Sequence, residues 1–213
     1  KAIELSLGVE VVTVLHERMG FTLFVENQVT AIGVDDLQSL IYFQAKVHPT
    51  LLVPHTETFT FAALHGSMKC LRYARQQGSN FSADALALTI THGHTEAVKF
   101  LHDECGMAYT AQTMMIAAHY QSSNLALFQY LHESECPWDD NVPALLAERN
   151  GLECLKFVRE NGCPWDSVTC ITASCNGHLQ CLQYAHKQGC PMNKKVMALA
   201  VENAHVHCLA YAC

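Results

Sequence analysis

Basic clusters are missing from this 213-residue sequence, and charge of either sign is sparse. Thirteen Lys and Arg residues stand against twenty Asp and Glu, which gives a formal net charge of −7. Proteins that hold nucleic acid by its phosphates need clustered Lys and Arg. The composition therefore argues against nucleic acid as the partner, while 50% hydrophobic residues supply ample material for a folded core.

Long apolar runs and catalytic motifs are missing as well. No apolar run reaches the roughly 18–20 residues that a membrane span needs, so we predict no such span. Glu4 and Glu10 interrupt the first apolar residues, unlike a signal peptide, and the chain begins in the middle of a repeat unit, so we expect a fragment of a longer protein. The sequence contains no glycine-rich phosphate loop, nucleophile elbow or HExxH motif. We predict no enzymatic activity, no cofactor and no small-molecule substrate.

An internal repeat runs through the whole chain. A Cys-Pro phrase begins at Cys136, Cys163 and Cys190, with offsets of 163 − 136 = 27 and 190 − 163 = 27. The residues that open the second helix of each unit are Val9, Leu37, Met68, Thr95, Leu125, Leu152, Leu179 and Val206. Their steps are 28, 31, 27, 30, 27, 27 and 27 residues, which indicates eight units.

Each unit has the pattern of two helices. In the second helix apolar residues form one stripe, as at Leu179, Leu182 and Tyr184. Gly162 and Gly189 follow second helices, where a glycine can adopt positive φ. The N-caps expected before first helices are Asp166, Asn193 and Asp139 or Asp140. No segment alternates with period two, so we predict an all-α fold, an α-solenoid of about eight helix–turn–helix units.

Residues 1–213 are interpreted as a single repeat domain. One unit cannot bury its own apolar face, so neighbouring units must stack to form a continuous core. Breaks between units are expected near 20, 47–57, 78, 105–111, 136, 163 and 190. The two longest steps predict loop insertions within 46–57 and around 106–112.

The repeated phrase resembles the ankyrin-repeat family. Residues 61–66 (Phe-Ala-Ala-Leu-His-Gly) and 173–182 are similar to the family's core "AAxxGHxxxVxxL", and residues 151–166 look like the divergent subtype "GHLECLKYLHENGCPWD". The resemblance covers essentially the whole chain and implies a protein-binding scaffold, often joined to other domains. The units here are mostly 27 residues against about 33 in the family, and they lack its TPLH tetrapeptide. We therefore expect a tight turn between units and a partner bound on the first-helix surface.

Eleven cysteines and thirteen histidines invite disulfide, metal or acid–base chemistry. Most cysteines share repeat positions, and equivalent positions in packed helices lie roughly 8–10 Å apart, beyond the roughly 7 Å between Cα atoms that a disulfide allows. No CxxC pair occurs, and His205, His207 and Cys208 lack a fourth zinc ligand. We expect free, partly buried thiols, no metal site, and an intracellular, reducing compartment, best matched by the cytoplasm.

Ring side chains recur at two further repeat positions. A column late in the second helix contains His16, His102, His132 and His186, together with Arg75 and Arg159. A cation or imidazole there suits the negative end of the helix dipole. Trp138 and Trp165, the two tryptophans, are expected to pack over junctions between units; exposed, they would be binding hot spots.

Another protein is the predicted partner, bound on the concave face lined by the first helices. The residues expected on this face are His65, His92, Gln121, Glu148, Arg149, Asn176 and Glu202, with Trp138 and Trp165 as further candidates. A mixed polar and apolar surface fits protein recognition. The leading hypothesis is a non-catalytic interaction module, an adaptor or substrate-receptor scaffold. A structural subunit of a large assembly is the alternative, and a thiol- or metal-dependent sensor or enzyme is the third hypothesis.

Overall fold

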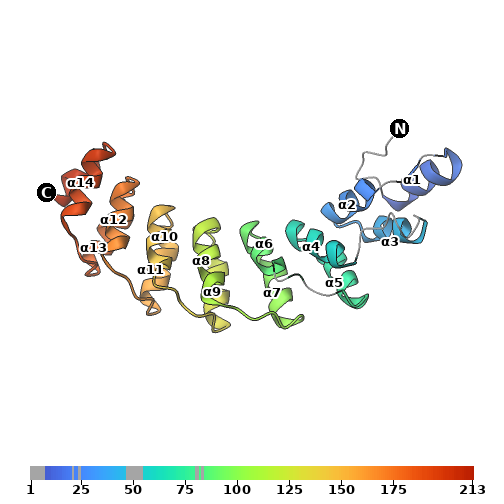
Figure 1. Cartoon of the computed structure of the whole chain (residues 1–213), viewed down its shortest axis with the longest axis horizontal. Helices are drawn as coiled ribbons and strands as arrows, with labels where there is room; N and C mark the ends of the chain where they lie inside the picture. Colours follow the sequence, from blue (N-terminus) through green and yellow to red (C-terminus); the bar gives the residue numbers. More distant parts are fainter. Residues whose placement is uncertain (1–7, 21, 24, 47–54, 80–81, 83) are drawn as a thin grey trace. The chain divides into compact units, whose positions relative to one another are not determined.

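Every regular element that the structure describes is helical. The structure is a computed structural model that describes residues 8–20, 22–23, 25–46, 55–79, 82 and 84–213. These residues contain no strand, and none of their helices is long and apolar enough to cross a membrane. The chain divides into two compact units, residues 1–107 and residues 108–213, which are described separately (Figure 1).

Residues 1–107 contain helices that alternate between two positions in the repeat. The helices are α1 (Val9–Thr13), which continues into the π-helical turn η1 (Val14–Arg18), α2 (Val25–Gly33), α3 (Leu37–Lys46), α4 (His55–His65), α5 (Met68–Gln76), α6 (Ala85–Thr91) and α7 (Thr95–Asp103). The first helices α2, α4 and α6 pack on one another in sequence order, and the second helices α1, α3 and α5 do the same.

Residues 108–213 repeat this arrangement. The helices are α8 (Ala111–Tyr120), α9 (Leu125–Glu133), α10 (Val142–Glu148), α11 (Leu152–Glu160), α12 (Ser167–Cys175), α13 (Leu179–Lys187), α14 (Lys194–Glu202) and α15 (Val206–Ala212). In Figure 1, α8, α10, α12 and α14 follow one another in one row, and α9, α11 and α13 form a second row. Each row packs its successive helices side by side.

All eight predicted starts of second helices are confirmed, because α1, α3, α5, α7, α9, α11, α13 and α15 begin at the predicted residues. The predicted caps Asp166 and Asn193 are confirmed too, since their side chains accept hydrogen bonds from the Val168 and Lys195 amides. The expected cap at Asp139 or Asp140 is wrong. Asn141 is the N-cap of α10, and the Asp139 carboxylate accepts from the Asn141 amide at 2.8 Å.

The predicted loop insertion around 106–112 is also wrong in form. The extra three residues of that unit are distributed over its length, as a comparison with the α12 unit shows. The connection 104–110 is one residue longer than 161–166, α8 has 10 residues where α12 has 9, and the turn 121–124 is one residue longer than 176–178. The other predicted insertion falls largely on residues 47–54, outside the described residues.

The turn 121–124 between α8 and α9 has no left-handed residue, whereas the turn in each of the other six described helix pairs contains one. It lies two positions before the second helix and has positive φ at Asp35, Gly66, Gly93, Asn150, Gly177 and Ala204. Glycine adopts this conformation without strain, and Asn and Asp tolerate it better than other residues. Gly162 and Gly189 have φ of +86° and +83° after α11 and α13, which confirms their predicted role.

The core is a stripe of small and branched side chains along each helix pair. Leu71, Val98, Phe128, Leu155 and Leu182 are the fourth residues of successive second helices, and each is fully buried. Small residues such as alanine fill much of the first helices and allow neighbouring helices to approach closely. This packing leaves the ends of the first helices at the surface.

Candidate partner-binding surface

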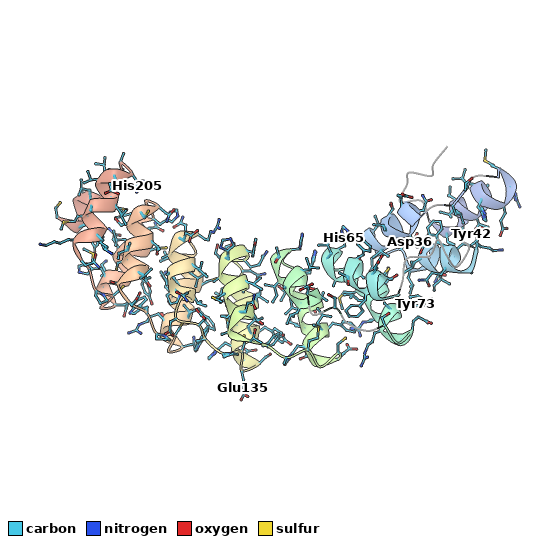
Figure 2. The ribbon with its side chains drawn as sticks, in the orientation of Figure 1. Asp36, Tyr42, His65, Tyr73, Glu135 and His205 are labelled. Atoms are coloured by element: carbon cyan, nitrogen blue, oxygen red, sulfur yellow. The ribbon has the colours of Figure 1, made fainter. Side chains whose placement is uncertain are left out.

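The predicted partner-binding residues share one structural position, the C-terminal end of a first helix. His65 is the last residue of α4, and His92 caps α6. In residues 108–213, Gln121 caps α8, Glu148 and Arg149 end and cap α10, Asn176 caps α12, and Glu202 ends α14. Within each compact unit these residues form a row, and Figure 2 labels His65 at the end of its helix.

In residues 1–107 this row is built from imidazoles. The His92 and His94 rings are stacked, with centroids 6.3 Å apart and planes 10° from parallel. His92 Nδ1 lies 2.9 Å from the Leu88 carbonyl oxygen of its own helix. His65 lies against Gly33 at the end of α2. The row therefore presents rings whose orientation is set by neighbouring backbone.

In residues 108–213 an arginine connects two first helices. Arg149 Nη2 lies 2.8 Å from His119 Nε2 on α8, and Arg149 Nε lies 3.6 Å from the Glu148 carboxylate. The His119 ring contacts Tyr120 edge-on, with centroids 4.6 Å apart. The Tyr120 side chain is 55% exposed, which is unusual for so large a ring. The result is an aromatic, cationic and anionic group held close together at one surface.

Amide side chains occupy the same position further along the row. Asn176 Nδ2 donates to the Thr172 carbonyl at 2.9 Å, and Asn203 Nδ2 donates to the Leu199 carbonyl at 3.0 Å. Each of these carbonyls also accepts the backbone amide of the same asparagine, so the side chain adds a second hydrogen bond at the end of its helix. Glu202 is exposed beside Asn203. Polar groups thus continue the surface past α12 and α14.

The residue just before the second helix has a role that the sequence did not predict. His94, His178 and His205 place Nε2 within 3.0 Å of the Leu64, Glu148 and Cys175 carbonyl oxygens, each on the first helix of the preceding pair. Ser67 donates in the same way to the Ile32 carbonyl, at 2.5 Å. The Gly-His dipeptide at fixed spacing was the available signal. Its meaning depends on contacts about thirty residues apart.

The ring column late in the second helix contacts aromatic side chains. His16 Nδ1 and His186 Nδ1 each lie 2.9 Å from a tyrosine hydroxyl, of Tyr42 and Tyr211 respectively, on the next second helix. His102 Nδ1 instead lies 2.8 Å from the Met107 carbonyl oxygen. These imidazoles therefore have specific partners, in addition to the helix-end position that suggested a dipole interaction.

Both tryptophans are half-buried at junctions between pairs. The Trp138 ring stacks on His132, with centroids 5.1 Å apart. The Arg159 guanidinium lies over Trp165 at 4.6 Å from the ring centroid, and Tyr184 meets the same ring edge-on. These contacts match the predicted packing role. Contact of either ring with a partner stays a prediction.

The cysteines are free thiols, and most are buried more completely than expected. The loop thiols of Cys136, Cys163 and Cys190 donate to carbonyls near the start of the first helix of their own pair, at 3.6, 3.7 and 3.0 Å. Burial raises the pKa of Cys136 and Cys163 to about 12. A thiol with so high a pKa stays protonated near neutral pH and is a poor nucleophile.

Across the described parts of the chain, no three His, Cys, Asp or Glu side chains gather into a group that could hold a metal ion. His205 is oriented instead by the Cys175 carbonyl, and the Cys208 side chain is buried. No protein-family model matches the sequence, and no curated protein is similar enough to count as a relative. The function must therefore be argued from the surface itself.

Proposed function

We propose that this chain is a non-catalytic ankyrin-like solenoid module that binds another protein along the row of first-helix ends. The proposal comprises an adaptor or a substrate-receptor scaffold. The observation that supports it most is the cluster of His119, Tyr120, Glu148 and Arg149, where an exposed tyrosine adjoins a positioned arginine. Tyrosine and arginine are the residues most enriched in binding hot spots.

The rigidity of the supporting helices favours recognition. Ala117 and Ala118 beneath His119 and Tyr120 are fully buried, and the α10 side chain Leu146 is fully buried as well. Side chains on a packed helical framework lose less conformational freedom on binding than side chains on a loose loop. Within residues 1–107, His65 and His92 form a separate surface of the same kind.

The cysteine chemistry supports a non-catalytic role in a reducing compartment such as the cytoplasm. Burial raises the pKa of Cys154 to about 12 and that of Cys181 to about 11, so neither thiol supplies a ready thiolate. Free thiols in such number are typical of proteins from reducing compartments.

Affinity capture from a native extract tests the proposed surface. Immobilised wild-type chain is compared with Tyr120→Ala and Arg149→Ala, and bound proteins are quantified by mass spectrometry. We expect each substitution to reduce capture of the same partner set by about tenfold, which is the effect of removing about 1.4 kcal/mol of binding free energy.

Lys156→Ala is the matched control. Lys156 is partly exposed on the second helix α11 and pairs with Glu153, at 2.7 Å. Capture should be unchanged in this variant, and circular dichroism should show the same helical content in all four proteins. Equal capture by wild type and both surface variants would refute the proposed site. A single stoichiometric complex that neither substitution affects would favour a structural subunit.

A further inference from the structure

The last helix pair exposes a set of apolar side chains on one face. Val201 and Met197 on α14 are 60% and 37% exposed, and Val206, the first residue of α15, is 68% exposed. These three are among the large hydrophobic residues most open to solvent in residues 108–213. Such side chains are costly to leave in water, so a cluster of them marks a surface that is normally covered.

The preceding pairs show what covers the equivalent positions. Ser174 and Cys170, which lie 27 residues before Val201 and Met197, are fully buried. The Ser174 hydroxyl donates to the Val196 carbonyl of α14 at 2.7 Å, so the next first helix is what buries it. One pair further back, Ala147 occupies the position of Ser174 and is fully buried beside α12. The exposed face of α14 therefore corresponds to the face that α12 buries against α14, but no following first helix covers it.

The turn of the last pair has the same left-handed backbone conformation as turns that contact a following pair. In the α2–α3 pair the left-handed residue contacts the following second helix, since the Asp35 carboxylate accepts from the Lys69 and Cys70 amides at 2.9 and 3.1 Å. Ala204 has the equivalent conformation, with φ of +57°, although alanine rarely adopts it. Beside Ala204 lies a hollow of about 240 Å³, lined also by Val206 and His207.

The last first helix also offers the backbone carbonyl that a bridging histidine would need. His178 reaches the Glu148 carbonyl and His205 reaches the Cys175 carbonyl, each spanning thirty residues to the preceding first helix. The next acceptor in this series is the carbonyl of Glu202, at the end of α14. A histidine that precedes one further second helix would reach it.

We propose that the face formed by Met197, Val201, Ala204 and Val206 is the docking surface for one further helix pair of the same repeat. Continuity with the α10–α12 and α12–α14 interfaces identifies the occupant, because those interfaces bury the positions equivalent to Met197 and Val201 with such a pair. This inference does not rest on the proposed partner-binding surface. Each can fail alone.

An extended chain tests the proposal. A copy of residues 187–189 followed by a copy of residues 163–189 is added after Cys213, which preserves the 27-residue spacing and supplies a histidine at the required position. In a stack, a terminal pair gains stability from its new neighbour. We expect the thermal midpoint of residues 108–213, followed by tryptophan fluorescence, to rise by about 3 °C or more. Amide exchange in α14 and α15 should slow by about tenfold.

The Val201→Asp substitution distinguishes docking on this face from a stabilisation caused by the longer chain alone. In the 213-residue chain Val201 is exposed, so the substitution should move the midpoint by less than about 1 °C. In the extended chain the same substitution should remove most of the gain, because it would bury an unpaired carboxylate. Lys195→Ala is the control, since the equivalent Val168 remains 42% exposed beside a following pair. It should leave the gain intact.

Two outcomes would overturn the proposal. An extended chain with unchanged midpoint and unchanged exchange in α14 and α15 would show that this face does not accept a helix pair. Concentration-dependent dimerisation of the 213-residue chain, abolished by Val201→Asp in analytical ultracentrifugation, would assign the face to a second copy.

Discussion

Residues 1–107 and residues 108–213 contain the same kind of helix pair, but the side chains that join neighbouring pairs differ in part. In residues 1–107 the Asp35 carboxylate caps the next second helix, and both the Ser67 hydroxyl and the His94 imidazole reach the preceding first helix. In residues 108–213 His178 and His205 make the bond to the preceding first helix, buried loop thiols follow α9, α11 and α13, and half-buried tryptophans follow α9 and α11.

Other features of the repeat are common to both parts. Both have a buried apolar stripe along the second helices, and both have left-handed turn residues, although the α8–α9 turn has none. The group that bridges two pairs varies among serine, histidine and aspartate, because any of them can satisfy a backbone carbonyl or amide at that distance. Stability should therefore depend strongly on the shared features and on the thiols, and weakly on surface pairs.

Alkaline pH should produce the largest difference between the unfolding free energies of the two parts. Burial is the main cause that raises the pKa of Cys136, Cys154 and Cys163 to about 12 and of Cys181 to about 11 in residues 108–213, and of Cys70 to about 12 in residues 1–107. Unfolded thiols ionise near pH 8.5. The stabilisation is therefore complete below about pH 8.5 and is lost as pH rises toward the folded pKa.

Each such thiol should cost about 1.4 kcal/mol of unfolding free energy per pH unit above that point. Four of them in residues 108–213 against one in residues 1–107 predict a much steeper loss in the second part. Urea titrations between pH 7 and 10.5 check this. Fluorescence of Trp138 and Trp165 reports residues 108–213 alone, while far-UV circular dichroism reports both parts. Parallel loss by the two probes would contradict the expectation.

Gly177→Ala should destabilise residues 108–213 by about 3 kcal/mol. The residue has φ of +73°, and an added Cβ would lie 2.6 Å from His205 Nδ1, so the substitution strains the turn and displaces the histidine. Gly189→Ala has φ of +83° but open space around the new Cβ, and should cost only about 1–2 kcal/mol. Chemical denaturation measures both. Equal losses would show that the contact with His205 contributes nothing.

His178→Ala should cost about 1–2 kcal/mol, because it leaves the Glu148 carbonyl without its donor. Ser67→Ala should cost a similar amount in residues 1–107 through the Ile32 carbonyl. His207→Ala, at an exposed position, is the control and should change stability by less than about 0.5 kcal/mol. If only one of the two substitutions lowers the unfolding free energy, histidine and serine are not equivalent as bridging residues.

The smallest expected effect concerns a surface pair. Arg72 Nη1 lies 2.6 and 2.9 Å from the two Glu104 oxygens, and its guanidinium lies over Phe100. Both charged side chains are about half exposed, so water screens the pair, and Arg72→Ala should cost about 0.5–1 kcal/mol. A double-mutant cycle with Glu104→Ala isolates the pair. A coupling above about 2 kcal/mol would contradict this assignment.

Much of the fold and part of the candidate surface were predictable from local signals. Helix starts followed from the apolar stripe, and the caps at Asp166 and Asn193 followed from residue chemistry. The row of first-helix ends followed from the 27-residue spacing. The Arg149–His119 contact did not, because it joins residues thirty apart whose side-chain rotamers depend on packing.

The sequence by itself determined the repeat, its period and the positions of its helices, because these depend on interactions within a few residues along the chain. Only the tertiary structure decided which side chains bridge neighbouring pairs. Glu135 (labelled in Figure 2) and Ala204 have the left-handed conformation of the equivalent glycines, Gly162 and Gly177, although their residue types disfavour it. The side chains that bridge neighbouring pairs join residues about thirty apart in sequence, so no local sequence pattern records them.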